Sequence, residues 1–391
     1  MRVFRVVCFV LFFTMIAVLL PASKVPSAQA LAVYDPHSVT NNLFGIHILF
    51  PEELSKAADL VNSSGGDWGY VTIPIQASDK NIDKWQKFMD DCKKYHLIPI
   101  VRLATDGDFF NKSSWSIPND GDVMDFANFL DSLSWPTQNR YVVIYNEPNR
   151  ADEWGGEPDA DAYAQILDYA VSEFKRVNPD FFIIAAGLDN ASINNPNGQS
   201  INEFTYMSQM NDAVSGIFSE IDGIASHSYP NPGFSAPPSD YREGIYSFYY
   251  QNNLIYSLTG KTLPVFITET GWSNTVITSS QQVSYYSDAI SNYWNDQNIV
   301  AVTPFILDAG SGPFAQFSFL NSGNQTELYK AYKNFPKIKG QPLLAKDFEV
   351  SIQTKEQLIP VEKFKKNEGI QTIFEGINKS TKTFFKWLLK A

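Results

Sequence analysis

Two glutamates follow directly on hydrophobic runs and are the residues of this chain best suited to chemistry. Glu147 lies in the string Tyr-Asn-Glu-Pro-Asn at 145–149, and Glu269 in Thr-Glu-Thr-Gly-Trp at 268–272. A carboxylate at the end of a buried strand is costly unless it has partners or a function. Two carboxyl groups facing one another across a cleft are what cleavage of a glycosidic bond requires. One must be protonated to assist the leaving oxygen, and the other must be ionised to attack the anomeric carbon or to activate water.

The two glutamates are 122 positions apart, so only the fold can bring them together. A parallel barrel does so, because the loops that follow its strands all leave from the same face. We expect Glu147 to stay protonated beside apolar strand residues, and Glu269, which lies between two threonines, to be ionised. For either residue alone, a structural ion pair or a loop cap is the alternative interpretation.

The elements that must position these residues alternate along the chain. Strand-like runs occupy 43–49, 69–75, 97–103, 140–145, 181–186, 223–227, 264–268 and 300–307. The clearest helical patterns occupy 51–61, 82–95, 122–133, 160–177 and 280–294. Long loops rich in Asn, Pro, Gly and aromatic residues follow the fourth, fifth and sixth strands, at 149–158, 190–200 and 229–239. Eight strands separated by helices predict an α/β fold, a (β/α)8 TIM barrel, with its site in these loops.

The N-terminal segment has the pattern of a secretory signal. Arg2 and Arg5 precede an apolar run at 6–20, and Ala28-Gln29-Ala30 fits a small-x-small cleavage site. We therefore predict three parts: a signal peptide at 1–30, the barrel at 31–338 and a Lys-rich extension at 339–391. The predicted localisation is secreted or extracytoplasmic. An uncleaved membrane anchor is the alternative for the first segment, because the apolar run is near the lower length limit for spanning a bilayer.

Composition excludes several classes of protein. With 44 % hydrophobic and 14 % aromatic residues, the body of the chain is not disordered. Residues 1–30 hold three of the 30 basic side chains and no acidic one, so the remainder carries 27 basic and 42 acidic residues, a net charge of −15. This charge argues against nucleic acid as a partner. Only Cys92 follows the predicted signal, so that part of the chain forms no intramolecular disulfide.

The C-terminal extension differs in composition from the rest of the chain. Residues 363–391 contain seven Lys and two Glu, with apolar residues at near-helical spacing. An amphipathic helix in peripheral contact with a membrane is one interpretation. A helix packed on the barrel, or a loosely ordered tail, is the other.

The motifs around both glutamates resemble those of the retaining glycoside hydrolases of clan A over roughly residues 43–320. In that clan, Asn-Glu-Pro ends the fourth strand of a (β/α)8 barrel and a second Glu ends the seventh. The resemblance implies that Glu147 is the acid/base, that Asn146 binds the sugar 2-hydroxyl and that Glu269 is the nucleophile. The implied activity is cleavage of β-glycosidic bonds in oligo- or polysaccharides by double displacement. Similar clan members also place a His and a Tyr on strand six, where this chain has His227 and Tyr229.

The expected roles of these two residues and of Arg102 follow from their positions. His227 would tune Glu147, and the Tyr229 hydroxyl would hold Glu269 as a carboxylate. Arg102 ends the third strand and would either hold Glu269 ionised or pair with a nearby aspartate.

Two tryptophans are the remaining candidate site residues, and the chain departs from the clan pattern at two positions. Trp272 and Trp154 lie in site-side loops, where each would either stack on a sugar face or pack in the core. Strand two lacks the arginine common in the clan. Strand eight lacks its tryptophan, for which Phe305 or Phe317 would substitute. Both departures weaken any transfer of substrate specificity.

Two other function classes compete with a secreted glycosidase. A catalytically silent, carbohydrate-binding barrel would also keep a cleft, but it has no need of both Glu147 and Glu269. A metallohydrolase would use His227 with the two glutamates. However, the four histidines form no H-x-H or H-E-x-x-H pattern, and no glycine-rich phosphate loop occurs. The sequence therefore predicts no metal and no cofactor, and a carbohydrate as the partner.

Overall fold

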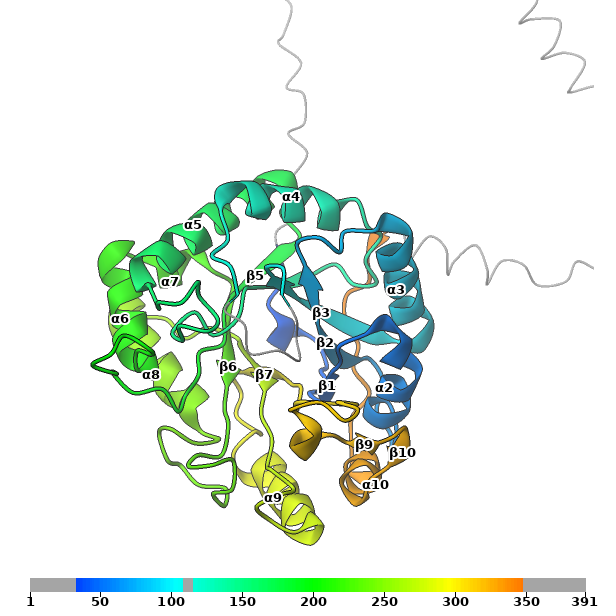
Figure 1. Ribbon diagram of the computed structural model, residues 1–391. Helices are drawn as coiled ribbons and strands as arrows, with labels where there is room; N and C mark the ends of the chain where they lie inside the picture. The colour runs from blue at the N-terminus through cyan, green and yellow to red at the C-terminus, as the bar shows by residue number, and fades with distance from the viewer. Residues whose placement is uncertain (1–32, 108–114, 347–391) are drawn as a thin grey trace, which may run out of the picture. The chain divides into compact units, whose positions relative to one another are not determined.

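Eight strands form one parallel sheet whose strand order follows the chain (Figure 1). The computed structural model describes residues 33–107 and 115–346. The strands are β1 Gly45–His47, β2 Gly69–Gln76, β3 Leu97–Ala104, β4 Arg140–Ile144, β5 Phe181–Ala185, β6 Gly223–His227, β7 Val265–Glu269 and β8 Ile299–Val302. Each pairs with the next in parallel register.

The first and last strands meet and close the sheet into a barrel. Val302 N–H donates to Leu43 O at 2.9 Å, and His47 N–H donates to Pro304 O at 3.0 Å. A parallel bridge also joins Phe44 to Val302. The predicted fold class, a (β/α)8 TIM barrel, is therefore confirmed.

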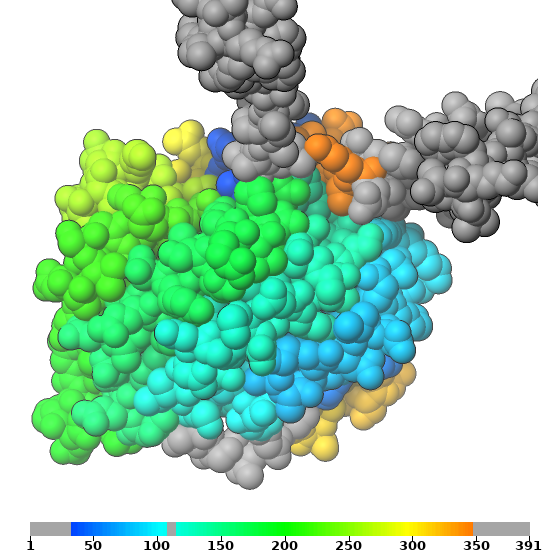
Figure 2. Space-filling view, turned by 90° about the horizontal axis from the view of Figure 1, so that it is seen from above, coloured from blue at the N-terminus to red at the C-terminus, as the bar shows by residue number. Residues whose placement is uncertain are grey.

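Helices surround the barrel and cover its strands. They are α2 Leu54–Val61, α3 Ile82–Tyr95, α4 Asp120–Asp131, α5 Ala160–Val177, α6 Glu203–Ala213, α7 Ile217–Glu220, α8 Ser247–Thr259, α9 Ser279–Asn292 and α10 Glu327–Asn334. Short 3₁₀ turns occur at Pro36–Ser38 (η1), Pro51–Glu53 (η2) and Ala315–Phe317 (η3), and a small hairpin joins β9 Leu320–Asn321 to β10 Asn324–Gln325. Helices α4 and α5 pack against one another, as Figure 1 shows, and their residues form part of the face seen in Figure 2.

Aromatic side chains fill the barrel at the end where the strands begin. Tyr70, Tyr141, Phe182 and Phe266 are each the second residue of their strand, and all are buried. The Tyr141 ring centroid lies 5.1 Å from that of Phe182 and 5.2 Å from that of Phe266. This layer closes the N-terminal end of the barrel. The polar residues farther along the strands are therefore accessible only from the C-terminal end.

The structure differs from the sequence prediction at several boundaries. The predicted strand at 300–307 ends at Val302, because Pro304 has no N–H for the ladder and the segment after it pairs with the 317–320 region instead. Helix α9 begins at Ser279, one residue earlier than predicted, because Thr278 and Gln281 form a capping box in front of it. Helix α8 was not predicted, because the face it buries includes Gln251 and Asn252 and has no clear apolar period.

Tyr163 on α5 ties the ends of two strands together and supports a stability prediction. Its hydroxyl donates to Ile144 O at 3.0 Å and accepts from Ala186 N–H at 2.7 Å, in a fully buried site. Tyr163→Phe leaves a buried carbonyl and a buried amide without these partners, so we expect a loss of about 1–3 kcal/mol of unfolding free energy in urea titration. Tyr256→Phe, at an exposed tyrosine, is the control and should change stability little; an equal effect of both variants would contradict this account.

Two of the three predicted parts of the chain lie largely outside the described residues. The signal segment at 1–30 and residues 347–391 of the Lys-rich extension are not covered, so their predicted roles remain predictions. Within 33–107 and 115–346, no helix has the length and apolar character needed to cross a membrane. Cys92 is buried on α3 as a free thiol.

Candidate active site

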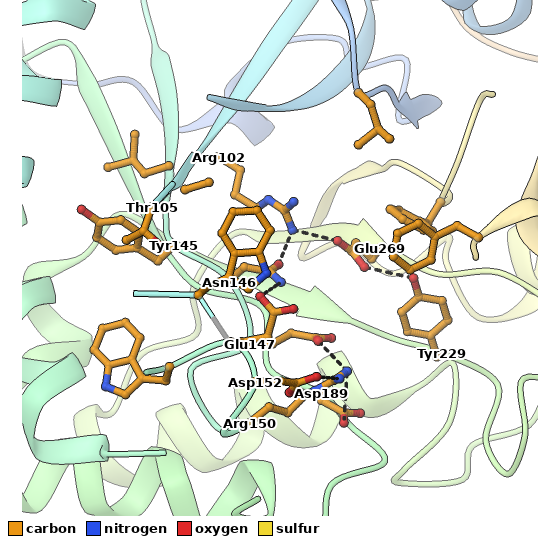
Figure 3. A pocket seen from close by; sticks show the side chains of 18 of the residues that line it. Arg102, Thr105, Tyr145, Asn146, Glu147, Arg150, Asp152, Asp189, Tyr229 and Glu269 are labelled. Atoms are coloured by element: carbon orange, nitrogen blue, oxygen red, sulfur yellow. Dashed lines mark hydrogen bonds and ion pairs between the residues drawn. The ribbon is translucent and has the colours of Figure 1, made fainter. Parts of the chain in front are cut away.

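Four charged or polar side chains converge where strands β3, β4, β6 and β7 end. Arg102 lies on β3, Glu147 follows β4 by three residues, and His227 and Glu269 are the last residues of β6 and β7. All four are buried, with Glu147 7 % and Glu269 8 % exposed. Figure 3 shows Arg102, Asn146 and Tyr229 grouped around Glu269, with Arg150 beside Glu147. The barrel therefore brings together the two glutamates that are distant in sequence.

The backbone after β4 turns sharply to present Glu147. Tyr145 and Glu147 both have positive φ, at 67° and 35°, which few non-glycine residues adopt. The turn is held by hydrogen bonds, since Glu147 N–H donates to Gly187 O at 3.0 Å and Arg150 N–H donates to Glu147 O at 3.0 Å. A Cβ at position 187 would lie 2.2 Å from His227 Cδ2, so only glycine leaves room for the imidazole beside Glu147.

Both carboxylate oxygens of Glu269 accept a hydrogen bond. Arg102 Nη1 donates to Oε1 at 3.0 Å, and the Tyr229 hydroxyl donates to Oε2 at 3.0 Å. The alternative aspartate partner of Arg102 within the described residues, Asp106, instead accepts from Ser78 N–H. Glu269 thus has the donor environment of an ionised carboxylate, fixed in orientation by two neighbours.

Glu147 is held by two cationic partners. His227 Nδ1 lies 2.8 Å from Glu147 Oε1, and Arg150 Nη1 lies 3.1 Å from Oε2. Asp152 anchors Arg150 from the other side through Nε at 3.0 Å and Nη2 at 2.6 Å. Both oxygens of Glu147 are therefore engaged in this ligand-free site.

These contacts shift the pKa values of Glu147 and His227. Burial alone would raise the pKa of Glu147, but the Arg150 charge and the hydrogen bond and charge of His227 outweigh it and lower that pKa. Burial would lower the pKa of His227, but the charges of Glu269 and Glu147 outweigh it and raise that pKa. The lowered pKa runs against the expectation that Glu147 is protonated, which stays a prediction. That expectation considered only the apolar strand and missed the cation three residues downstream.

The two glutamates lie close enough to act on one bond. One carboxylate oxygen of Glu147, one ring nitrogen of His227 and one carboxylate oxygen of Glu269 all lie within 4.8 Å of one another. Retaining glycosidases hold their two carboxyl groups about 5–5.5 Å apart, whereas inverting enzymes leave more room for a water. The approach of these oxygens to within 4.8 Å places both carboxyl groups within reach of one bond.

The same three groups have the donor types of a metal site, but their surroundings oppose a cation. Arg102 and Arg150 each place a positive charge on one of the carboxylates, and the His227 Nδ1 atom already contacts Glu147. A metal ion would have to displace both guanidinium contacts. The arrangement therefore favours proton transfer and nucleophilic chemistry over metal binding.

The cavity above these groups has a volume of about 300 Å³, and eight of the described residues that line it are aromatic. Of the two tryptophans predicted to stack on sugar, Trp154 lines it, although the side chain is almost fully buried against Tyr145 and Tyr163. Trp272 is not among the described residues that line it, so of the two alternatives for this residue the structure favours packing in the core. It packs against Tyr286 and Trp294 and donates its indole N–H to Ala236 O.

Other aromatic residues line the cavity and could stack on a sugar there, the role considered for Trp272. Phe305 and Phe317, proposed as substitutes for a strand-eight tryptophan, both line the cavity. Trp115, Phe234 and Phe314 line it as well and were not singled out from the sequence. Their positions in long loops gave no period or motif that would distinguish them from packing residues.

Sequence reasoning also missed polar residues of the site. Arg150 and Glu153 lie in the loop predicted at 149–158, but no role was assigned to either. His47 on β1 is fully buried, with Nε2 3.8 Å from Glu269 Oε1, and burial lowers its pKa well below the ordinary value. Asn146, which was predicted to bind the sugar 2-hydroxyl, lines the cavity; its Oδ1 accepts from Arg102 and its Nδ2 donates to Glu153 Oε2 at 3.1 Å.

Comparison with known proteins identifies the structures that share this fold. No family model and no curated protein sequence matches the chain. A family 5, subfamily 18 glycoside hydrolase from Streptomyces cattleya, solved with Manβ1-4GlcNAc, is 12 % identical with a TM-score of 0.55; the match covers 76 % of this chain and 80 % of that one. A family 39 β-xylosidase from Caulobacter crescentus is 15 % identical with a TM-score of 0.53, covering 79 % and 74 %.

A third match is a family 39 glycoside hydrolase from Bacteroides cellulosilyticus WH2, at 18 % identity and a TM-score of 0.52. It covers 78 % of this chain but 64 % of that protein, which is less than two thirds of its length. The chain shares its fold with (β/α)8-barrel glycoside hydrolases. The resemblance to clan A predicted from the sequence is thus confirmed for the fold, and activity and substrate are argued separately below.

Proposed function

We propose that this protein is a retaining glycoside hydrolase that cleaves β-glycosidic bonds, with Glu269 as nucleophile and Glu147 as acid/base. The observation that carries this proposal is the approach of two buried carboxylates to within 4.8 Å at the C-terminal face of the barrel. Each has partners suited to its role: Arg102 and Tyr229 orient Glu269, and His227 contacts Glu147.

Double displacement would use these groups in order. The Glu269 carboxylate attacks the anomeric carbon, and the glycosidic bond breaks as Glu147 delivers a proton to the leaving oxygen. Glu147 then accepts a proton from water, which attacks the glycosyl–enzyme ester and releases the sugar with its anomeric configuration retained. Arg102 and Tyr229 stay paired with the Glu269 carboxyl group and hold it in line.

The proton that Glu147 needs can come from His227. In the proposed mechanism, His227 Nδ1 and Glu147 Oε1, which lie 2.8 Å apart, hold one proton between them before substrate binds. Transfer along that contact gives neutral His227 and protonated Glu147 without a change in the total number of protons. The two groups therefore titrate as a unit, and activity is lost when pH rises far enough to remove their shared proton.

Arg150 sets the pH at which this proton is lost. Its positive charge, 3.1 Å from Glu147 Oε2, favours the deprotonated carboxylate. Arg150→Gln removes that charge, so we expect the pKa of the pair to rise and the alkaline limb of the kcat/KM profile to move up by about 1–3 pH units. Arg242→Gln, at an exposed arginine paired with Glu243, should leave the profile in place. An unchanged or acid-shifted limb in Arg150→Gln would contradict this role.

The alternative is a catalytically silent, carbohydrate-binding barrel. One observation favours it: both oxygens of Glu147 are engaged by Arg150 and His227, as in a structural ion-pair network. The test is hydrolysis of a panel of aryl β-glycosides and plant or microbial polysaccharides by the wild-type protein and by Glu269→Ala. Activity that is present in the wild type and absent in the variant supports the glycosidase. Binding of these sugars without hydrolysis by the wild type supports the silent barrel.

Localisation and the terminal segments are also part of the proposal. A secreted protein would deliver this site to polysaccharides outside the cell, in keeping with the predicted signal at 1–30. Peripheral membrane contact through the Lys-rich extension would hold the enzyme near the membrane surface. Detecting the processed protein in culture medium, or finding it only in the membrane fraction, distinguishes cleavage from anchoring.

A further inference from the structure

The charged side chains that line the cavity are unevenly balanced. The described lining includes five carboxyl groups, from Glu147, Asp152, Glu153, Asp189 and Glu269. The basic side chains in the same described lining are Arg102 and Arg150. A substrate therefore enters a cavity whose described lining carries more acidic than basic side chains.

Both arginines are already paired. Arg102 contacts Glu269 and Asn146, and Arg150 contacts Glu147 at 3.1 Å and Asp152 at 2.6 Å. A carboxylate on a sugar ring would have to compete with these internal carboxylates for each guanidinium. Since the internal pairs are preformed and partly buried, an incoming anion gains little from either arginine and is repelled by the remaining acidic groups.

Glu153 is the cavity carboxyl group without an arginine of its own. Its Oε2 accepts a hydrogen bond from Asn146 Nδ2 at 3.1 Å, and within the described ranges no Lys or Arg forms an ion pair with it at 4.0 Å or less. Burial and the Glu147 charge raise the pKa of Glu153 to about 7. This environment suits a partner that donates hydrogen bonds, such as a sugar hydroxyl or amino group, and opposes a second anion.

Resting on the proposed glycosidase function, we propose that Glu153 is a specificity-determining residue that binds hydrogen-bond donors of the sugar and excludes uronic acids. The substrate class is then a glycan without carboxylate groups at the cleavage site, whether uncharged or bearing amino groups. Asn146 links Glu153 to Arg102 and so couples recognition of the sugar to the group that orients Glu269.

The test compares one polysaccharide before and after oxidation of its C6 hydroxyls to carboxylates, so that only charge and the C6 group differ. At a pH above 7, where Glu153 is ionised, we expect the wild type to prefer the native polymer at least about tenfold. We expect Glu153→Gln to reduce this preference by about tenfold, because an amide keeps the shape but removes the charge. Glu157→Gln, an exposed glutamate of the same loop outside the cavity lining, should keep the wild-type preference. High salt should weaken the preference of the wild type more than that of Glu153→Gln.

A binding measurement separates this inference from the proposed function. Calorimetric titration of the same two polymers into Glu269→Ala, with and without Glu153→Gln, needs no turnover. The inference is supported if the native polymer binds more tightly than the oxidised one and this difference depends on Glu153. If the wild type hydrolyses neither polymer, the proposed function fails but this binding result still supports the inference. If both polymers bind equally well, or are hydrolysed equally fast, the inference is overturned. Hydrolysis of both polymers would still support the proposed function. Binding of neither polymer overturns the inference.

Discussion

Glu269→Ala is expected to abolish hydrolysis, with a loss in kcat on the order of 10⁵-fold, because no other group is held in line to attack the anomeric carbon. Added azide should restore turnover of an activated aryl β-glycoside, since the space left by the carboxylate admits a small anion. The product should be the inverted, α-configured glycosyl azide. The measurement is release of the aryl group together with NMR analysis of the azide product.

Two controls give this result its meaning. Glu220→Ala, at an exposed glutamate of α7 away from the cavity, should retain wild-type activity. Thermal unfolding of Glu269→Ala should show that the barrel still folds, because the variant leaves Arg102 and Tyr229 in a cavity that solvent can enter. A folded Glu269→Ala with near-normal activity would remove the glycosidase mechanism and leave the sugar-binding barrel as the better account.

Glu147→Ala is expected to affect substrates according to their leaving groups. Glycosides with poor leaving groups need a proton at the departing oxygen, so their kcat/KM should fall by about 10²–10⁴-fold. Activated aryl glycosides need little protonation and should lose far less in the first step. The measurement is kcat/KM for a series of aryl glycosides whose leaving groups differ in pKa. In Glu147→Ala, kcat/KM should depend more steeply on leaving-group pKa than in the wild type.

The product formed with azide distinguishes the two carboxylates. In Glu147→Ala the Glu269 ester still forms, so azide attacks it and gives a glycosyl azide of retained, β configuration. Glu269→Ala gives the opposite anomer. Equal losses on good and poor leaving groups, or an α-azide from Glu147→Ala, would assign Glu147 a role other than acid/base.

Much of the fold followed from strong local patterns. The runs before Glu147 and Glu269 are β-branched or aromatic and bounded by turn residues, and β4 and β7 lie where those runs predict. Where burial is shared between polar and apolar residues, as on α8, the pattern gave no signal because tertiary contacts rather than periodicity select those positions.

The candidate site was only partly predictable, for a different reason. Glu147, Glu269, His227 and Tyr229 each end or follow a strand, so strand order alone places them together. The role of Arg150 depends on a turn with positive φ that directs it back onto Glu147, which residue types do not reveal. The Arg150 charge that this geometry brings to Glu147 lowers the pKa of that carboxyl group, which the sequence did not predict.

The aromatic lining followed no sequence rule either. Trp272 comes three residues after Glu269, yet its ring turns into the core between the barrel and α9, where it contacts Tyr286. Phe305 and Phe317 reach the cavity from segments that pair with each other after β8. Which loop aromatics face sugar is decided by loop conformation, and loop conformation is set by long-range contacts.

The stereochemical outcome of hydrolysis tests the central claim most directly. Wild-type protein and a β-linked substrate are followed by ¹H NMR from the first minutes, before the free sugar equilibrates its anomers. Two carboxylate oxygens within 4.8 Å predict that the β anomer appears first. Initial formation of the α anomer would show that water attacks directly across a wider gap, and it would contradict the assignment of Glu269 as nucleophile.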